Sequence, residues 1–560
     1  MNNLVESFQE VVGRKHVLIT ETDKQNFLKG YRYGAGEALA VVRPGSLLQL
    51  WRIVQLCLKS HAIIVMQAAN TSLTGGATPH GVYDREVVLV ETLRLRQIHI
   101  LGKGEQVVCH PGATLHCLGQ ELEPYGRDPH SELGSSCLGA SVMGGVCNNS
   151  GGALVRRGPA YTEAALYARV NGRGELDLVN DLDIDLGCNP EEILRRLEDG
   201  EFEKSNISRC KHTCSAERYI DQVSKIDDPS PARFNANPEY LHSASGSAGR
   251  IIVFAVRLDT FPKSKKTRFF HIATNSADDL TLLRRSMLKD GACVPISAEY
   301  LSKEVFDLSF RYGKDTFLAV RYLGTHRLPA LFRFRRFADR VLTQIKPGLR
   351  HGSDRVLQFL SKYLFPAHLD RQLRRVGEKY AHHLFLKVDD EQTQFIQDLV
   401  NTRFCKSNIY VQLCSETQAR DLALHRFAAA GAAIRYSVLN ERRLGELIAL
   451  DVALPRNTSE WNDLIPNDLR DQVDGAFLYG HFFCHVFHLD IVLKRGTVSS
   501  EFKERMLGEF EDRGAECPAE HNVGHLYKAK PELCAFYREL DPTNSLNPGI
   551  GQTSRNESWA

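Results

Sequence analysis

The sequence predicts an α+β protein with a ligand-binding domain, a second α+β domain and a basic insert. Three observations predict this: a glycine-rich run at 133–161, short alternating strands and helices up to about residue 261, and a second such series from about 265. A chain of 560 residues is too long for a single core. Its hydrophobic content of 43% and charged content of 25% are typical of globular proteins.

The glycine-rich run reads LGSSCLGASVMGGVCNNSGGALVRRGPAY. Glycine permits backbone conformations and close approaches with which bare amides surround a ligand. We therefore expect a cradle for a large, flat, phosphate-bearing cofactor, with a glycine-rich surface loop as the alternative. The spacing is not G-x-G-x-x-G, so NAD binding is not predicted.

A strand–helix–strand unit is predicted near the N-terminus. Residues 38–42 are apolar, residues 46–60 show helical spacing with Ser46 as N-cap, and residues 62–66 are apolar again. The second strand leads into QAANTSLTGGATP at 67–79, which is made almost entirely of small residues. Loops after strand C-termini are where α/β sheets bind ligands, so this loop is a second candidate for cofactor contact.

The remaining elements are assigned by apolar pattern and turn residues. Residues 181–245 are expected to form connecting loops. The expected elements are strands at 86–93, 97–101 and 106–110, a helix at 114–123, a hairpin at 164–175, a strand at 251–261, then a strand at 267–273, a helix at 278–288, a strand at 381–388, a helix at 416–431 and a strand at 447–454.

Several classes of protein are disfavoured by composition. The N-terminal residues have no apolar segment typical of a secretory signal, and no run of about 18 apolar residues occurs, so any membrane contact is expected to be peripheral. The 14 cysteines form no C-x-x-C pair, which favours reduced thiols in the cytosol.

Residues 321–379 contain 14 Lys and Arg against four acids, with aromatic residues between them. Such a segment can lie on an anionic membrane leaflet, where each basic group contributes about 1 kcal/mol. A solvated basic face and a nucleic-acid patch are the alternatives, because attraction to phosphate does not separate them.

Histidines and acids cluster near the C-terminus. YGHFFCHVFHLD contains His481, His485 and His488, and AEHNVGHLYKA contains Glu520 and His521. Clustered histidines beside an acid are typical of either a metal site or acid–base chemistry.

The order of motifs from 38 to 180 resembles the FAD-binding domain of the vanillyl-alcohol oxidase/p-cresol methylhydroxylase (PCMH) flavoproteins. The resemblance implies a two-lobed PCMH-type domain with FAD on two loops, together with an α+β cap domain. No histidine occurs in Gln67–Asn70, where some members attach FAD, so non-covalent FAD is expected. The implied cofactor contacts are Ala68, Ala69, Asn70, Thr71, Ser72, Gly76, Ala77, Gly134, Ser141, Gly151 and Val253.

The C-terminal motifs resemble those of FAD-linked 2-hydroxyacid dehydrogenases, which carry G-H-x-G-D-G-N-x-H, then E-H-G-I-G. The resemblance implies that His481, His488 and Glu520 are metal ligands, that His521 is the base, and that Arg426 binds the substrate carboxylate. The G-D-G-N segment is replaced by FCHV here, which leaves the divalent metal an open alternative.

QAANTSLTGG, the cradle, HRFAAAGAAIRY and YGHFFCHVFH together resemble the quinone-dependent D-lactate dehydrogenase family of bacteria. This implies D-lactate as substrate, membrane quinone as acceptor, and no nucleic acid. It also implies a peripheral protein on the cytoplasmic face of the inner membrane, held to anionic phospholipid by 321–380.

The expected domains are 1–265 (FAD), 266–320 and 381–515 (cap), 321–380 (mainly helical insert) and 516–560 (a return to the FAD domain). One alternative is a soluble dehydrogenase of another D-2-hydroxy acid with a protein acceptor. Another is a basic membrane- or nucleic-acid-associated binding protein on a vestigial flavin fold.

Overall fold

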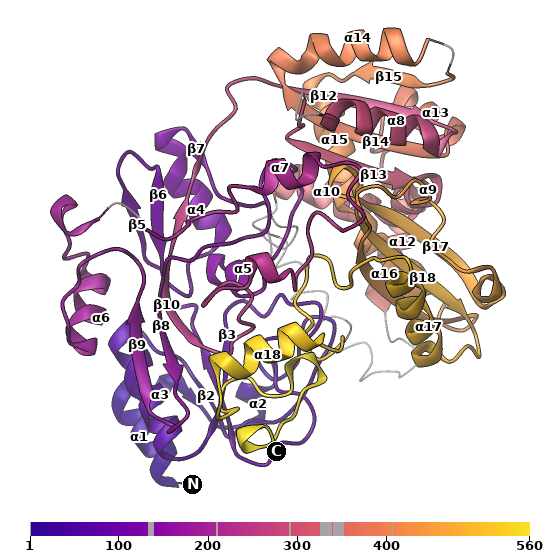
Figure 1. The fold of residues 1–560 in the computed structure, drawn as a ribbon. Helices are drawn as coiled ribbons and strands as arrows, with labels where there is room; N and C mark the ends of the chain where they lie inside the picture. The colour runs from indigo at the N-terminus through magenta and orange to yellow at the C-terminus, as the bar shows by residue number, and fades with distance from the viewer. Residues whose placement is uncertain are drawn as a thin grey trace.

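The chain folds into two lobes, seen in a computed structural model that describes residues 2–132, 139–208, 211–289, 293–324, 327, 339, 352–405 and 407–560. The first lobe runs from indigo to magenta in Figure 1, and the second lobe is mainly orange and gold. The last residues, yellow in the same view, lie against the first lobe. Gly134 and residues 325–326, 328–338 and 340–351 of the basic insert lie outside the described residues.

The first sheet of the N-terminal lobe has four strands in the order β1-β2-β4-β3, of which the last three are parallel. The predicted strand–helix–strand unit is present as β2, α3 and β3, and the Ser46 hydroxyl accepts a hydrogen bond from the Gln49 amide (3.1 Å) as the N-cap. However, β4 lies between β2 and β3, so the two predicted strands are not neighbours. These strands are β1 (Val17–Leu18), β2 (Ala40–Val42), β3 (Ile63–Gln67) and β4 (Val87–Glu91).

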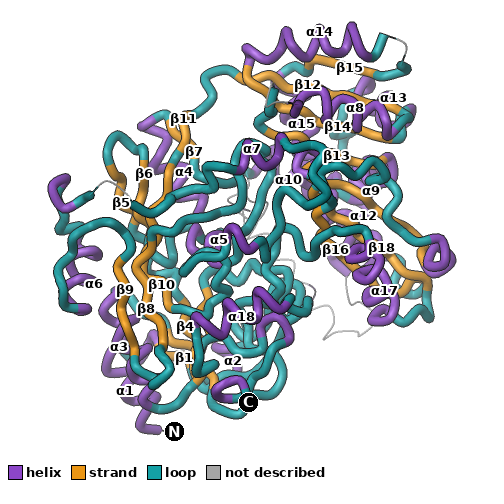
Figure 2. The backbone as a smooth tube through the Cα atoms, viewed as in Figure 1, coloured by secondary structure: helices purple, strands orange, loops and turns teal. Residues whose placement is uncertain are grey.

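The second sheet of this lobe is antiparallel, in the order β5-β6-β10-β8-β9, and shares one apolar core with the first sheet. Both sheets are visible as neighbouring sets of strands in Figure 2. A short pair, β7 with β11, extends the lobe toward the cap. These strands are β5 (Ile98–Leu101), β6 (Gln106–Cys109), β7 (Arg127–Asp128), β8 (Ala165–Val170), β9 (Leu176–Asn180), β10 (Ile252–Asp259) and β11 (Phe261–Pro262).

Helices cover the outer faces of the first lobe. The prediction that 181–245 form only connecting loops is wrong, because α6 and α7 lie there. In α6 the Asn189 side chain caps the first turn and an apolar face of Ile193, Leu194 and Leu197 is buried in an otherwise charged sequence. The helices are α1 (Asn2–Val12), α2 (Glu21–Lys24), α3 (Leu47–Lys59), α4 (Leu115–Leu122), α5 (Val142–Cys147), α6 (Pro190–Asp199) and α7 (Tyr219–Ser224).

The cap is built on a seven-stranded antiparallel sheet in the order β15-β12-β14-β13-β17-β18-β16. Alternate residues of its strands enter two different cores. One core includes α8, α14 and α17, and the other includes α9, α10, α15 and α16. The strands are β12 (Thr267–Thr274), β13 (Ser297–Ser302), β14 (His382–Asp389), β15 (Tyr410–Leu413), β16 (Leu444–Ala453), β17 (Val473–His481) and β18 (Val486–Lys494).

The helix predicted at 416–431 is two helices, because the chain bends at Ala428 so that α16 packs along α9. No helix among the described residues is long and apolar enough to cross a membrane. The cap helices are α8 (Ala277–Leu288), α9 (Lys303–Tyr312), α10 (Lys314–Leu323), α12 (Gly352–Tyr363), α13 (Arg371–Lys379), α14 (Thr393–Arg403), α15 (Glu416–Phe427), α16 (Ala429–Leu439) and α17 (Ser499–Asp512).

After α17 the chain returns to the first lobe and ends there after α18 (Pro531–Leu540). Leu546 pairs with Ile64 beside the first sheet. The Asn547 side-chain amide donates to the carbonyls of Gly76 (2.9 Å) and Ala248 (2.7 Å). The C-terminal segment therefore contacts the first loop predicted to hold the cofactor and the segment that precedes β10. The predicted domain limits themselves stay predictions.

Candidate active site

One face of the cap sheet carries a row of ionisable side chains. Asp451 of β16 lies opposite His488 of β18, which lies opposite Tyr479 of β17. Two residues further along β17, His481 lies opposite Glu299 of β13. Directly opposed residues, and residues two apart on a strand, project from the same face. Sheet register therefore brings together the two histidines predicted as metal ligands.

The turn between β17 and β18 explains the departure from the family motif. Phe482–Cys484 form a short 3-10 turn that is fully buried, and His485 follows with φ 52°. The Phe482 ring packs on Trp461 at 4.7 Å between centroids. His485 Nδ1 is 2.9 Å from the Pro455 carbonyl. The residues that replace G-D-G-N thus belong to the cap core, and His485 lies outside the cluster.

The C-terminal segment adds Glu520 to this face. The Glu520 amide donates a 2.7 Å hydrogen bond to Asp451 Oδ2, which fixes the position of the backbone. Glu520 Oε2 is 3.1 Å from His481 Nε2 and 3.7 Å from His488 Nε2. The three side chains predicted as ligands therefore converge, with one ligand atom from each lying within 4.8 Å of the others.

Each of the two histidines also contacts a carboxylate through its other ring nitrogen. His481 Nδ1 is 2.6 Å from Glu299 Oε1, and His488 Nδ1 is 3.3 Å from Asp451 Oδ1. A carboxylate on one ring nitrogen orients the other nitrogen, which is the usual arrangement behind metal-ligating histidines. The donor set and its support therefore fit a divalent metal bound by two imidazoles and a carboxylate.

The charged side chains of the cluster shift one another's pKa values. Burial alone would lower the pKa of His481, but Glu299 and Glu520 outweigh it and raise this pKa to about 10. Burial alone would raise the pKa of Glu520, but His481 and Arg233 hold it well below its usual range. Glu520 is therefore ionised and available as a ligand or charge partner at neutral pH.

Arg233 connects this cluster to the first lobe. It is 1% exposed, and its Nη2 donates to Glu520 Oε1 (2.5 Å) and to the Gly152 carbonyl (2.9 Å). A Cβ at Gly151 would lie 2.5 Å from the same Glu520 oxygen and 2.9 Å from Arg233 Nε. The cradle glycine therefore lies directly against the Glu520 carboxylate, and a side chain at 151 would displace it.

His521, the predicted base, lies beside the cluster. Its ring stacks on His488 with centroids 6.5 Å apart, and its Nε2 is 3.8 Å from Asp451 Oδ2. The side chain is 33% exposed, so a substrate can reach it. Partial burial lowers its pKa, against the opposing effect of Asp451, so the ring is neutral at pH 7 and can accept a proton.

Arg426, predicted to bind the substrate carboxylate, lies at the end of α15 next to the cluster. Its Nε is 2.8 Å from Glu299 Oε2, and its guanidinium lies over the Tyr479 ring at 4.6 Å. Arg426 is thus at the site but is already paired with a carboxylate.

Side chains of the first predicted cofactor loop form hydrogen bonds within the loop. Gln67 Nε2 donates to the Ala77 carbonyl (2.7 Å), and the Ser72 hydroxyl accepts from the Gly76 amide (3.2 Å). Asn70 has φ 52° and donates to the Lys29 carbonyl. Ala68, Ala69 and Thr71 lie within this loop.

In the second loop, the Ser141 hydroxyl accepts from the Gly144 amide as the N-cap of α5. Asn522, next to His521, joins the two loops, since its Nδ2 donates to Asn148 Oδ1 (2.9 Å) and a Cβ at Gly76 would lie 3.7 Å from its side chain. Val253 is buried on β10. Gly134 lies outside the described residues.

Buried polar atoms around these loops lack hydrogen-bond partners among the described residues. They include Asn149 Oδ1, Ser247 Oγ and Asn547 Oδ1. Buried polar atoms are normally paired, so orphaned ones beside a cradle of small residues indicate a polar ligand. The residues present therefore fit a flat, phosphate-bearing cofactor such as FAD.

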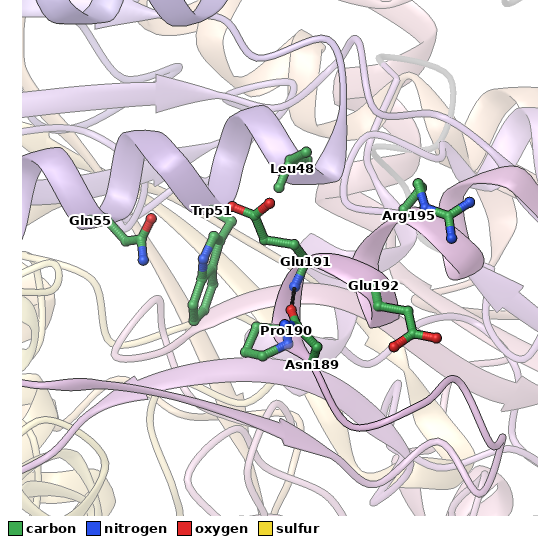
Figure 3. A pocket seen from close by; sticks show the side chains of 8 residues that line it. All are labelled: Leu48, Trp51, Gln55, Asn189, Pro190, Glu191, Glu192 and Arg195. Carbon is green, nitrogen blue, oxygen red and sulfur yellow. Dashed lines mark hydrogen bonds between the residues drawn. The ribbon is translucent and has the colours of Figure 1, made fainter.

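A separate groove of about 630 Å³ lies between α3 and α6. Figure 3 shows that Trp51 and Gln55 come from α3, whereas Asn189 and Glu191 come from the start of α6, where the Asn189 side chain accepts from the Glu191 amide. None of the predicted site residues lines this groove. It is a surface feature of the first lobe and not the cofactor cradle.

Three residues of the site were missed from the sequence. Asp451 carried a signal, because a charged residue interrupts the apolar strand LIALDVAL. Glu299 and Arg233 carried none, since SAEYLS and PARFN have no unusual pattern and lie far from the C-terminal motifs in sequence.

Two family models match the chain. Residues 38–174 match "FAD binding domain", and residues 269–559 match "D-lactate dehydrogenase, membrane binding". The fold and the site thus define a flavoprotein oxidoreductase with an FAD-binding lobe and a membrane-associating cap, which confirms the predicted fold class.

Curated relatives match over the whole chain. A quinone-dependent D-lactate dehydrogenase of Haemophilus influenzae is 46% identical and covers 100% of both chains. Those of Escherichia coli and Corynebacterium glutamicum are 46% and 39% identical, covering 98% and 99% of this chain and 96% and 98% of their own. The chain therefore belongs to the quinone-dependent D-lactate dehydrogenase family.

Solved structures share the fold at low identity. An alkyldihydroxyacetonephosphate synthase has a TM-score of 0.58 at 12% identity, covering 98% of this chain and 84% of its own. A p-cresol methylhydroxylase has a TM-score of 0.58 at 14% identity, covering 98% and 96%. These likenesses confirm the expected PCMH-type fold.

Proposed function

We propose that the protein binds FAD without a covalent link, oxidises D-lactate to pyruvate and passes the electrons to a membrane quinone. The observation that carries this proposal is the contact of Gly151, in the cofactor cradle, with Glu520, in the histidine cluster. That contact supports a position of the proposed acid–base residues next to the proposed flavin site.

The cofactor would be held by Ala68–Ser72, Gly76 and Ala77 in the first loop and by Ser141 and Gly151 in the second. Gly134 and Val253 are proposed contacts by motif. The Gln67–Asn70 segment contains no histidine for a covalent link. Bound FAD supplies the hydride acceptor that no protein side chain provides.

His521 would accept the proton of the substrate hydroxyl. The Asp451 carboxylate faces Nε2 and favours the tautomer that carries its proton there, which leaves Nδ1 as the basic nitrogen. Glu520 and Asp451 stabilise the imidazolium that forms, because both carboxylates raise the pKa of His521. As the alkoxide develops, the α-hydrogen leaves as hydride and the carbon becomes the carbonyl of pyruvate.

We also propose that His481, His488 and Glu520 bind one divalent cation. The carboxylates of Glu299 and Asp451 hold the two rings in the required orientation. When bound, the cation would supply a Lewis acid for the substrate's hydroxyl and carboxylate oxygens.

Membrane attachment is proposed to occur on the cytoplasmic face of the inner membrane, at anionic phospholipid, through 321–380. In the described part of this segment, α12 exposes an apolar face formed by Val356, Phe359 and Tyr363, which continues at Leu364 (58 to 69% exposed). Residues spaced by three and four lie on one helix face, and such a face can enter the lipid interface while basic neighbours bind phosphates.

The first experiment is the visible spectrum of the purified protein before and after anaerobic addition of D-lactate. We expect flavin bands that D-lactate bleaches and L-lactate does not. A flavin that stays oxidised would contradict the substrate, and a protein that cannot be reconstituted with FAD would contradict the enzyme.

The membrane proposal is tested by flotation with anionic and zwitterionic vesicles. Phe359→Ser with Tyr363→Ser should weaken binding to anionic vesicles and lower quinone reduction about tenfold, with flavin bleaching by D-lactate unchanged. Phe395→Ser, an exposed aromatic of α14, is the matched control. Full quinone reduction by the unbound double variant would contradict this role of α12.

A further inference from the structure

A tight loop of the first lobe, residues 29–35, reaches the active site and was not singled out in the sequence. Lys29 pairs with Ala35, and the Gly30 amide donates to the Gly34 carbonyl at 2.9 Å. This closure places Tyr31, Arg32 and Tyr33 at the tip of the loop.

The loop packs against the first cradle loop and is connected to the C-terminal segment through stacked rings. Asn70 Nδ2 donates to the Lys29 carbonyl at 2.9 Å. A Cβ at Gly75 would lie 2.8 Å from the Tyr33 carbonyl oxygen. The Tyr33 ring packs on His80 at 5.3 Å, which packs on His525 at 5.0 Å. The tip is therefore fixed between the first cradle loop and the segment that carries His521.

The positive charge of Arg32 acts on Tyr479 and His521 of the active site, and on Asp490, which accepts a hydrogen bond from the Tyr479 hydroxyl (2.9 Å). Burial raises the pKa of Asp490 on β18 and of Tyr479 on β17, and Arg32 opposes both effects. Partial burial lowers the pKa of His521, and Arg32 lowers it further. Arg32 therefore acts electrostatically on both strands of the β17–β18 hairpin and on His521.

Arg32 is exposed and makes no hydrogen bond or ion pair with any residue the structure describes. Arg426 differs, because Glu299 already pairs with it at 2.8 Å and the Glu299 carboxylate also holds His481. Of these two arginines at the site, Arg32 is thus the one whose charge is not already matched by a carboxylate in contact.

We infer that Arg32 binds the carboxylate of the 2-hydroxy acid from the first-lobe side, so that the substrate lies between Arg32 and His521. A guanidinium binds a carboxylate through paired hydrogen bonds, which fixes the orientation of the α-carbon. Arg426 then positions Glu299, and through it His481. This assignment rests on the proposed oxidation of a 2-hydroxy acid and names the residue that selects for its charge.

The test compares D-lactate with D-lactamide, its uncharged amide, in anaerobic flavin reduction. In Arg32→Gln we expect kcat/KM for D-lactate to fall about 10- to 100-fold, mainly through KM, with little change for D-lactamide. The preference for the acid over the amide should therefore collapse. Arg32→Lys should restore part of it. The matched control is Arg173→Gln, at an exposed hairpin tip of the same lobe.

Other results would contradict the assignment of Arg32 to the substrate carboxylate. Equal losses for both substrates, or loss of bound FAD measured by absorbance, would overturn the assignment. So would a collapse of the acid preference in Arg426→Gln with Arg32→Gln unaffected. Failure of the proposed function itself is recognised differently, since the wild-type flavin would then not be reduced by D-lactate.

Discussion

Arg233 and Glu520 form a buried ion pair of 2.5 Å between residues that are 287 positions apart in the sequence. It joins a loop of the first lobe to the C-terminal segment. The other oxygen of Glu520 faces His481 at 3.1 Å. A single carboxylate thus links the cofactor lobe to the histidines of the cap sheet, and both sides of the site depend on it.

Arg233→Met should destabilise the protein by about 3–5 kcal/mol, because it leaves the Glu520 charge buried without its partner. Urea unfolding measures the loss. The double variant Arg233→Met with Glu520→Gln should recover part of it, since the uncompensated charge is gone. Additive losses in the two single variants would show that the pair is not coupled.

The proposed metal site predicts one divalent cation per chain, measured by elemental analysis and by titration calorimetry of the chelated protein. His481→Ala and His488→Ala should each weaken binding at least about tenfold, because each removes a ligand. His485→Ala is the matched control from the same hairpin, since His485 is buried but does not face the cluster. A chelated protein that retains full activity would rule out a role for the metal in the reaction.

Local sequence patterns and recognisable motifs account for the elements and site residues that could be predicted. Short apolar segments bounded by turn residues predicted the strands of the first lobe, and resemblance to the family's C-terminal motifs predicted the two histidines and Glu520 as ligands. The insertion of β4 between β2 and β3 could not be predicted, because strand order depends on contacts between distant segments. The positions of Arg233 and Arg32 at the site could not be predicted either, because they come to lie there only when the C-terminal segment folds back onto the first lobe.

Gly151→Ala should disrupt both FAD binding and catalysis. The new methyl group would lie 2.5 Å from Glu520 Oε1 and 2.9 Å from Arg233 Nε, which is far inside van der Waals contact, and both of these side chains are buried. We expect flavin affinity, measured by titration of the apoprotein with FAD, to fall at least about tenfold.

Gly172→Ala serves as the control for this change. It lies in the same lobe, and a Cβ there meets no atom within 4 Å. Wild-type FAD affinity in Gly151→Ala would show that the Glu520 side chain does not press on the cradle.

Four buried histidines in the cap, outside the active site, predict how its stability depends on pH. His271 Nε2 is 3.2 Å from His383 Nδ1, and Phe306 separates His383 from His425, which neighbours His368. Burial lowers the pKa of His271 to about 3 and that of His368 to about 4. Burial also holds the pKa values of His383 and His425 well below the usual range.

The direction of the effect follows from where protons bind. Below pH 6.5 the unfolded chain protonates these histidines and the folded cap does not, so the free energy of unfolding falls as pH falls. The loss is about 1.4 kcal/mol per histidine for each pH unit, and for His368 it ends near pH 4. The neighbouring cations Lys303, Lys314 and Arg374 act in the same direction, because they further lower the pKa values of His383 and His368.

His368→Phe isolates one of these contributions. Neither ring nitrogen of His368 has a partner among the described residues, and the ring lies between Phe310 (5.1 Å) and Phe317 (4.7 Å), so phenylalanine replaces it without loss of a known hydrogen bond. Urea unfolding between pH 7 and 4.5 should show a slope shallower by about 1.4 kcal/mol per pH unit. His116→Phe, an exposed site on α4, should keep the wild-type slope. An unchanged slope in His368→Phe would mean that this ring is protonated in the folded cap, and would remove burial as the cause of the acid sensitivity.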